Sequence, residues 1–299
     1  MKLSSLITTA TQYAQPTIAV AQAADEEVLR AVREGLGQRL ANFYLVGDEH
    51  QIREKARSVE LDLQSLSVVH EPNPRQAAQR AVQLVREGKA NAVMKGLVPT
   101  ADLLKAVLDK EKGLKRQRLL SHVAAFEVPG YDRLIFITDP AMNIAPDLKQ
   151  KAEIIQNAVQ VARAAGVKRP KVAVLAPVEV VNPAMQSTLD AASLTLMARR
   201  GQITDCEVDG PLALDNAVSV EAARHKGIRS PVAGQADILL VPNIETGNVL
   251  YKSLVYFARA KVAAVVVGAE VPVILTSRAD SMEDKLYSMA LAVCLLNQG

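Results

Sequence analysis

The sequence predicts an α/β fold with mostly parallel sheets. Short β-branched runs alternate with amphipathic helical patterns along almost the whole chain. Several runs are apolar on both sides of the alternation, as in central strands that helices cover on two faces. The expected strands are Thr17–Val20, Asn42–Val46, Val68–His70, Ala92–Met94, Leu119–Phe126, Arg133–Thr138, Lys171–Ala176, Ile203–Val208, Ile238–Val241, Lys261–Val267 and Val271–Leu275. The clearest helices are Asp147–Ala165, Pro183–Arg200 and Val249–Ala260.

The chain is long enough for two domains. Its 299 residues can bury a sizeable core in each of two domains that share a cleft. A boundary is expected near Thr138-Asp139-Pro140, where a strand pair gives way to a loop and a long helix. Past Val271 the chain is expected to return to the first domain. The prediction is a first α/β domain of residues 1–138 plus 272–299, a second of residues 139–271, and a ligand cleft between them.

Composition narrows the class of protein. Apolar content of 49% and charged content of 22% are ordinary for a soluble globular protein. A net charge of +3 and 3% aromatic residues without Trp leave little for nucleic acid. Residues Leu3–Thr9 are too polar for a secretory signal, and the apolar run Val262–Ala269 is too short to span a membrane. We therefore expect a soluble, cytoplasmic protein.

Metal and nucleotide motifs are missing from the sequence. Cys206, Cys294 and the four histidines show no metal-ligand spacing, so no metal is expected. No G-x-x-x-x-G-K-[ST] or G-x-S-x-G occurs, and Gly35-Leu36-Gly37 lacks the third glycine of a dinucleotide fingerprint. These absences argue against a P-loop nucleotidase, an α/β-hydrolase and a dinucleotide-binding turn.

Polar groups follow four of the expected strands, at the edge where such sheets bind ligands. Lys95 and Gly96 follow the strand Ala92–Met94. Lys95 is a candidate phosphate ligand, Gly96 would let a ligand approach the backbone, and Thr100 would cap the next helix. Asn143 follows the strand that ends at Thr138.

The third strand end lies before a helix that Asn248 is expected to cap. Asn243 and Asn248 follow the strand Ile238–Val241, and each is either a ligand contact or a turn and cap residue. Lys252 would then lie in the first turn of the helix, an unfavourable place for a cation unless an anion is near. The alternatives for Lys252 are an exposed lysine or a partner of Glu245.

The fourth strand end carries the most chemistry. Ser277, Arg278, Asp280 and Asp284 lie within eight residues that lead from a strand into the last helix. A helix N-terminus suits an anion, and an arginine adds a bidentate clamp for phosphate or an oxyanion. The hypothesis is an acyl-transfer site that handles phosphate. The alternative is a plain helix cap formed by Ser281 and Asp284.

Two further segments have an ordinary structural interpretation. Asp209-Gly210-Pro211 follows the expected strand Ile203–Val208 and is interpreted as a turn. His122 follows an apolar run beside Ser121, and a buried structural role is the default.

Taken together, the strand-end segments resemble the phosphate acetyltransferase and phosphate butyryltransferase family over nearly the whole chain. Their order and spacing carry the resemblance, since no single segment is specific. It rests on Lys95-Gly96-Leu97 with Thr100-Ala101-Asp102, Asp139-Pro140-Ala141-Met142-Asn143, Asp209-Gly210-Pro211, Pro242-Asn243-Ile244 with Gly247, Asn248 and Lys252, and Ser277-Arg278 with Asp284.

The resemblance implies a fold similar to the isocitrate and isopropylmalate dehydrogenases, a homodimer or higher homo-oligomer, and acyl transfer between coenzyme A and phosphate. The family's serine–arginine pair and the aspartate seven positions later fall on Ser277, Arg278 and Asp284 as catalytic residues. Substrate contacts are expected from Lys95, Thr100, Asn143, Asn243, Gly247, Asn248 and Lys252. No cofactor is expected, because coenzyme A is a substrate.

The form Ser277-Arg278-Ala279 is closer to the butyryl type, because acetyl-type members usually have glycine after the arginine. Lys105 also stands where the acetyl-type pattern tends to place an arginine. The resemblance thus favours a phosphate butyryltransferase. The alternatives are a phosphate acetyltransferase, a metal-dependent decarboxylating dehydrogenase, which would need clustered aspartates, and a non-catalytic metabolite-binding protein on the same scaffold.

Overall fold

The computed structural model describes residues 2–114, 116–277 and 280–298, which form two compact units. The unit that we call the terminal unit comprises Leu3–Arg118 and the chain from Ala263 onward. The central unit comprises Leu119–Val262 together with Lys2. The boundary predicted between residues 138 and 139 falls inside the central unit, directly after a strand, and the assignment of domains stays a prediction.

The terminal unit is built on parallel strands in the order β3-β2-β1-β4-β11-β10, in which only β10 and β11 pair antiparallel among the described pairings. Ala21 pairs with Lys95, and Met94 pairs with Ile274, so β1, β4 and β11 end at the same edge. The strands are β1 (Thr17–Ala21), β2 (Asn42–Gly47), β3 (Ser67–His70), β4 (Ala92–Lys95), β10 (Lys261–Ala269) and β11 (Val273–Ile274).

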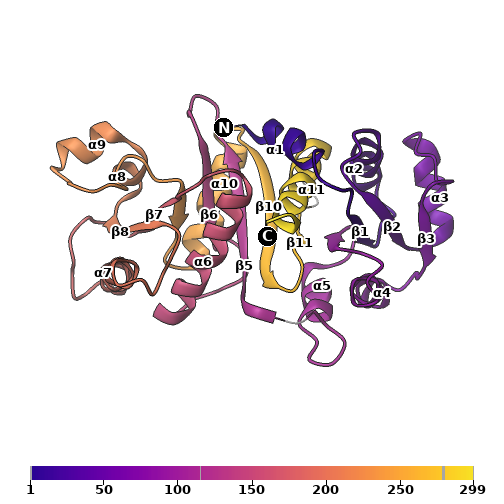
Figure 1. The fold of residues 1–299 in the computed structure, drawn as a ribbon, viewed down its shortest axis with the longest axis horizontal. Helices are drawn as coiled ribbons and strands as arrows, with labels where there is room; N and C mark the ends of the chain where they lie inside the picture. The colour runs from indigo at the N-terminus through magenta and orange to yellow at the C-terminus, as the bar shows by residue number, and fades with distance from the viewer. Residues whose placement is uncertain (1, 115, 278–279, 299) are drawn as a thin grey trace. The chain divides into compact units, whose positions relative to one another are not determined.

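Helices cover both faces of this sheet (Figure 1). Helix α11 packs against α1 and α2 on one face, and α4 packs against α5, β1 and β2 on the other. The helices are α1 (Leu3–Ala10), α2 (Glu26–Gly37), α3 (Glu49–Ser58), α4 (Pro74–Arg86), α5 (Thr100–Val107) and α11 (Met282–Leu296). Asp25, Asp48 and Asn73 cap α2, α3 and α4 through their side-chain oxygens, which fixes where these helices begin.

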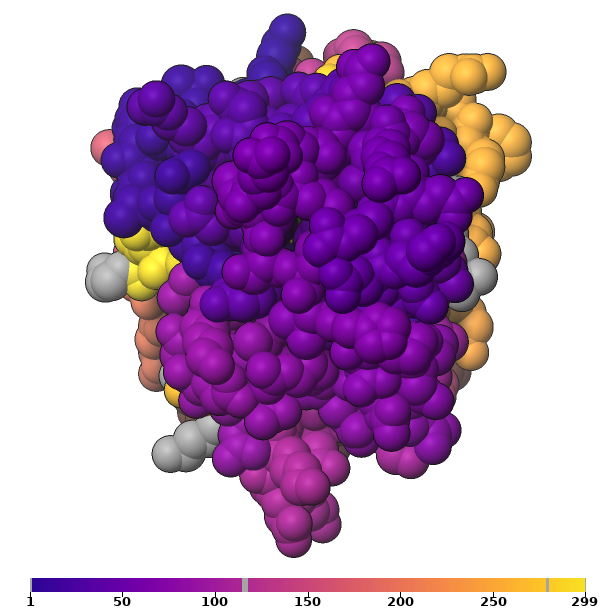
Figure 2. Space-filling model, turned by 90° about the vertical axis from the view of Figure 1, so that its right-hand side faces the viewer, coloured from indigo at the N-terminus to yellow at the C-terminus, as the bar shows by residue number. Residues whose placement is uncertain are grey.

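Residues of the terminal unit also form the face that Figure 2 presents, in indigo to magenta. In this unit the buried residues of α2 and α4 are Val, Leu, Ala and Gly, while the charged residues of both helices lie outside the core. This is the pattern of an amphipathic helix that lies on a sheet.

The central unit has the strand order β5-β6-β9-β7-β8, in which β5 and β6 are antiparallel and the other described pairs are parallel. Helix α6 packs on β6, β9 and α7, and α10 packs on β6. The elements are β5 (Arg116–Glu127), β6 (Leu134–Thr138), α6 (Leu148–Ala164), β7 (Lys171–Leu175), α7 (Gln186–Arg199), β8 (Glu207–Leu212), α8 (Leu214–Val218), α9 (Val220–His225), β9 (Ile238–Leu240) and α10 (Ile244–Tyr256).

The α/β class with mostly parallel strands is confirmed, and the expected strands are present with one displacement. The strand predicted at Ile203–Val208 runs instead from Glu207 to Leu212, so the interpretation of Asp209-Gly210-Pro211 as a turn was wrong. β8 lies at the end of the strand order, where a proline without an N–H is tolerated. A Cβ on Gly210 would lie 2.7 Å from the Val174 carbonyl oxygen, so glycine is needed for strand packing and not for a turn.

Within the part of the chain that the structure describes, no helix is both long enough and apolar enough to cross a membrane.

Candidate active site

The turn after β11 is held by a buried lysine. The Ser277 backbone N–H donates to Asp280 Oδ2 at 2.6 Å. Lys285, in the first turns of α11 and only 2% exposed, donates from Nζ to the carbonyl oxygens of Ser277 and Asp280. We call Ser277, Asp280 and Lys285 the β11 turn. The backbone groups of Ser277 and Asp280 are therefore held by a carboxylate and a cation from the same segment.

Lys95 brings a second buried cation to the β11 turn. It lies at the end of β4, is 5% exposed, and acts electrostatically on Asp280. Burial raises the pKa of the Asp280 carboxyl, while the Ser277 N–H and the charges of Lys285 and Lys95 act in the opposite direction. The neighbouring Asp284 carboxylate raises the Asp280 pKa, so two ammonium groups and two carboxylates act on one another at this turn.

Lys285 is a residue that sequence reasoning missed. From Leu286 to Leu295 every residue of α11 is buried, and Lys285 stands directly before this run. A lysine at the start of an otherwise buried helix was the available signal, because an ammonium group is buried only when polar groups compensate it.

Asp284 forms a helix cap with Ser281. The Ser281 backbone N–H and Oγ donate to Asp284 Oδ2 at 3.2 and 2.7 Å, and the Asp284 N–H donates to Ser281 Oγ at 3.1 Å. This reciprocal pattern is a capping box, the ordinary alternative noted for these two residues. It holds the carboxylate in one orientation. Arg278, the other catalytic candidate beside Ser277, lies outside the described residues.

One expectation at the end of β4, the Thr100 cap, was wrong. A Cβ on Gly96 would lie 2.2 Å from the Gln22 carbonyl oxygen, so the chain's own backbone after β1 requires glycine here, and a ligand contact stays a prediction. Thr100 does not cap α5 but is its first residue; the cap position is Pro99, and no side chain caps there. Within the described residues, no hydrogen bond joins Thr100 to the β11 turn.

A second group of polar residues surrounds Asp139 in the central unit. Asp139 follows β6 directly and is 3% exposed. Its Oδ1 accepts the N–H groups of Ala141 and Met142, at 2.9 and 3.0 Å. Its Oδ2 accepts the His122 N–H at 3.1 Å and Asn143 Nδ2 at 2.6 Å. The carboxylate therefore shapes the loop that carries Asn143.

The start of α10 packs against this loop. Asn243 Oδ1 accepts the backbone N–H and the hydroxyl of Thr246, at 3.0 and 2.7 Å, which makes Asn243 the cap of α10. A Cβ on Gly247 would lie 2.8 Å from the carbonyl oxygen of Asp139, so only glycine allows this contact. Asn248 Nδ2 donates to the Pro140 carbonyl oxygen at 3.3 Å.

The structure thus brings together four predicted residues, namely Asn143, Asn243, Gly247 and Asn248. We call this group the α10 corner.

The structure also corrects the predicted start of the helix α10. Because α10 begins at Ile244, Asn248 is inside it and is not its cap, and Lys252 is in the third turn and not the first. The dipole argument for an anion at Lys252 therefore fails. Lys252 is exposed, and within the described residues it forms no ion pair with Glu245.

Neither cysteine is suited to act as a nucleophile. Burial raises the pKa of the Cys206 and Cys294 thiols to about 11, so both are protonated near neutral pH. His122 is buried and its ring makes an edge contact with Tyr251. Among the described residues, no group of three or more His, Cys, Asp or Glu side chains is placed to hold a metal ion.

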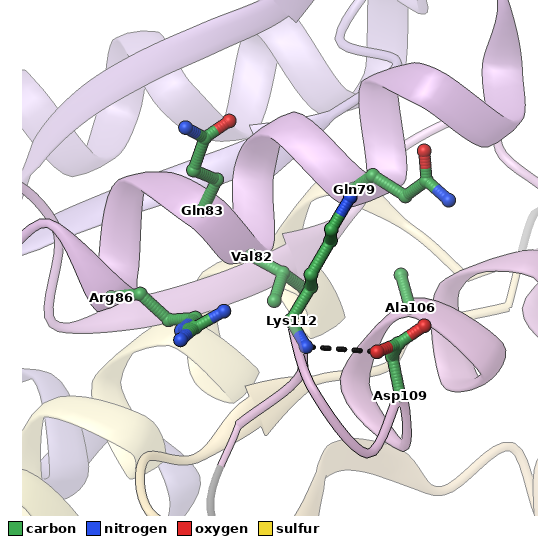
Figure 3. Close-up of a pocket in the computed structure, with 7 residues that line it drawn as sticks. All are labelled: Gln79, Val82, Gln83, Arg86, Ala106, Asp109 and Lys112. Carbon is green, nitrogen blue, oxygen red and sulfur yellow. Dashed lines mark hydrogen bonds between the residues drawn. The ribbon is translucent and has the colours of Figure 1, made fainter.

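A surface pocket of about 410 Å³ lies between α4 and α5 in the terminal unit (Figure 3). The Lys112 backbone N–H donates to Asp109 Oδ1 at 2.8 Å and closes the turn that bounds it. None of the predicted site residues lines it. The lining residues are Gln79, Val82, Gln83, Arg86, Ala106, Asp109 and Lys112.

Comparison with known proteins decides the family. A family model described as "Phosphate acetyl/butaryl transferase" matches residues 2–79 and 67–293. This chain belongs to the phosphate acetyl/butaryl transferase family. The family resemblance inferred from the strand-end segments is confirmed.

Individual members of the phosphate acetyl/butaryl transferase family match along almost the full chain. A probable phosphate butyryltransferase of Bacillus subtilis is 54% identical over 98% of both chains. The phosphate butyryltransferase of Clostridium beijerinckii is 53% identical over 92% of this chain and 91% of its own. A crystal structure of a branched-chain phosphotransacylase from Enterococcus faecalis superposes with a TM-score of 0.82 and 38% identity, covering 95% of this chain and 99% of that one.

Proposed function

We propose that this protein is a phosphate butyryltransferase, which transfers a butanoyl group reversibly between coenzyme A and inorganic phosphate. The observation that carries the proposal is the 54% identity to a probable phosphate butyryltransferase over 98% of both chains. Two buried lysines at the β11 turn, Lys95 and Lys285, support it, because both acyl phosphate and phosphate are anions.

In the proposed reaction the coenzyme A thiolate attacks the carbonyl carbon of the acyl phosphate, and phosphate leaves. In reverse, a phosphate oxygen attacks the thioester carbonyl carbon and the thiolate leaves. Arg278 stabilises charge that develops on the phosphate and carbonyl oxygens, and the Ser277 hydroxyl donates a hydrogen bond to the same group. Lys95 and Lys285 add positive charge behind the turn.

The proposed role of Asp284 is to orient the thiol of coenzyme A. It accepts the thiol proton only if neighbouring groups lower the pKa of the thiol. An ordinary aspartate and an ordinary thiol differ by roughly 4–5 pK units, so unaided transfer is uphill by about 6 kcal/mol. Ser281 already donates two hydrogen bonds to one oxygen of Asp284. We therefore assign most of the thiol activation to neighbouring cations, which lower the pKa of the thiol.

The α10 corner is the proposed contact for the rest of the substrate. Asn243 uses its oxygen to cap α10, so its amide nitrogen is left to donate to a ligand. Gly247 lets the start of α10 approach the Asp139 loop. Thr100, Asn248 and Lys252 stay in the proposal as weaker candidates, because the structure gives each a place different from the expected one.

The acyl-chain profile of the purified protein tests the function. Thiol release in the presence of phosphate is measured with acetyl-, propanoyl-, butanoyl- and isobutanoyl-coenzyme A. We expect kcat/KM to be highest for a four-carbon acyl group, and each buried methylene is worth about 0.8 kcal/mol or roughly fourfold. A clear preference for acetyl would make the protein a phosphate acetyltransferase, and no turnover with any thioester would favour a binding protein.

We further propose that the protein forms a homodimer through α10. Gly247 is the only buried residue among the thirteen of this helix. Val249 and Tyr256 are each 66% exposed, and Phe257, directly after the helix, is 88% exposed. Ile144, 68% exposed, lies at the other end, where its carbonyl oxygen accepts the Ile244 N–H. An antiparallel pair of helices would place each Phe257 beside the other copy's Ile144, the self-complementary contact of a two-fold dimer.

Replacing Phe257 by glutamate is expected to shift the dimer toward monomer. Burial of such a side chain contributes about 1.5–3 kcal/mol per copy, so the dissociation constant should rise by at least tenfold. Light scattering during size-exclusion chromatography at several concentrations measures this. Val180→Glu is the control, because Val180 is 62% exposed but lies outside α10. A monomeric wild type, or equal dimerisation of the two variants, would contradict the proposal.

A cytoplasmic location stays a prediction.

A further inference from the structure

Asn143 has both amide hydrogens occupied within the protein. Its Nδ2 donates to the Leu120 carbonyl oxygen at 2.9 Å and to Asp139 Oδ2 at 2.6 Å. The residue is half-buried, and within the described residues no hydrogen bond reaches its Oδ1. A carboxamide nitrogen has two hydrogens to donate, so nothing is left on it for a ligand.

The orientation of this amide is forced by its neighbours. A carbonyl oxygen and an ionised carboxylate only accept hydrogen bonds, so the amide nitrogen must face them and the amide oxygen must face away. Asp139 cannot turn aside to change this. Its two oxygens are held by three backbone N–H groups, those of His122, Ala141 and Met142. At 3% exposure, solvent gives it no alternative partner.

Asn143 therefore presents only an acceptor, with the charge of a carboxylate directly behind it. This is an unfavourable surface for phosphate oxygens, which are anionic acceptors themselves. It is a favourable one for a neutral N–H donor. Of the two substrates in the proposed function, coenzyme A carries such groups, because its pantetheine arm contains two amides. A thiol is a weaker donor.

We propose that Asp139 is a positioning residue that fixes Asn143 as a hydrogen-bond acceptor for an amide N–H of the pantetheine arm. The assignment rests on the proposed function and makes the α10 corner recognise coenzyme A. Asn243, which has the opposite polarity at the same corner, offers a donor and suits an oxygen ligand.

The experiment compares Asn143→Ala, Asp139→Asn and the double variant by calorimetric titration with coenzyme A and by steady-state kinetics with butanoyl-coenzyme A and phosphate. Asn143→Ala should raise the dissociation constant of coenzyme A, and the KM of its thioester, by about tenfold, with the KM of phosphate within twofold of wild type. Asp139→Asn replaces one of the two accepting oxygens by a donor, so the side chain no longer holds the Asn143 amide in one orientation; the same change is expected.

Coupling separates positioning from a general structural role. Both single variants act on the same acceptor, Asn143 Oδ1. The double variant should therefore bind coenzyme A no more weakly than Asn143→Ala alone. The control is Asp132→Asn, because Asp132 is an exposed aspartate that accepts a hydrogen bond from Arg133. Its dissociation constant for coenzyme A and its KM values should match those of wild type. Losses that multiply in the double variant, or a KM change for phosphate instead of the thioester, would overturn the assignment.

If Asp139→Asn does not fold, as urea unfolding will show, the KM split of Asn143→Ala decides the ligand. Two further outcomes distinguish this inference from the proposed function. If the wild type binds coenzyme A but transfers no acyl group, the proposed function fails while the titrations still test the Asn143 contact. If the wild type is active and Asn143→Ala binds coenzyme A normally, the inference fails and the function stands.

Discussion

Replacing Arg278 by alanine is expected to lower kcat/KM for butanoyl-coenzyme A by about 10²–10³-fold, the usual loss when one preorganised oxyanion donor is removed. The guanidinium is the proposed clamp on the oxygens where charge develops, and its fork reaches two oxygens at once. Lysine at this position keeps the charge but loses the fork, so Arg278→Lys should fall between alanine and wild type. Steady-state kinetics measure all three.

The interpretation requires that the Arg278 variants remain folded. The backbone groups of Ser277 and Asp280 are held by the Asp280 carboxylate and by Lys285, so loss of the Arg278 guanidinium should leave the free energy of unfolding within about 0.5 kcal/mol of wild type. Arg53→Ala is the matched control, since Arg53 is an exposed arginine that pairs with Glu49 on α3. A folded Arg278→Ala enzyme that turns over at the wild-type rate would remove Arg278 from the mechanism.

Much of the fold follows from local pattern, and the exceptions have a physical cause. Strands such as β1 and β6 are short β-branched runs that are buried on both faces, so composition alone identifies them. The displaced strand β8 contains Asp209-Gly210-Pro211, which has turn chemistry locally. Its place at the end of the strand order and the close contact of Gly210 with Val174 override that chemistry.

The candidate site was predictable where a residue follows a strand, and not where its role depends on burial. Within the terminal unit the strand-end rule points to Lys95 and Ser277, because β4 and β11 are parallel and end at a common edge. Within the central unit it points to Asn143 and Asn243, which follow the parallel strands β6 and β9. It misses Lys285, which is fixed by two carbonyl oxygens that only the folded turn presents.

The same limit applies to the start of α10. Gly247 in the sequence suggests that the helix begins after it, because glycine disfavours helix interiors. The actual cap is Asn243, and Gly247 is kept inside α10 by its close contact with Asp139, a residue far away in the sequence. Contacts of this kind are set by the sheet and cannot be seen in a local window.

Replacing Lys151 by methionine is expected to destabilise the protein by about 3–5 kcal/mol, the largest effect on folding that we predict. Lys151 on α6 pairs with Asp190 on α7 at 2.6 Å, and their side chains are only 7% and 10% exposed. Methionine fills the space of the lysine stem but leaves the carboxylate buried, and Gln186 Nε2, at 2.8 Å, is then its one hydrogen-bond partner among the residues that the structure describes. An uncompensated buried charge is costly, so urea unfolding followed by far-UV circular dichroism should show a lower midpoint.

The double variant Lys151→Met with Asp190→Leu tells whether charge or packing causes the loss. Removing both charges leaves two apolar side chains of similar size, so stability should return to within about 1 kcal/mol of wild type, as buried pairs often contribute little over apolar replacements. Lys149→Met is the control on the same helix, because Lys149 is exposed and its loss should change stability by no more than about 0.5 kcal/mol. If the double variant is as unstable as Lys151→Met, the pair acts through packing between α6 and α7, and the buried charge is not the cause.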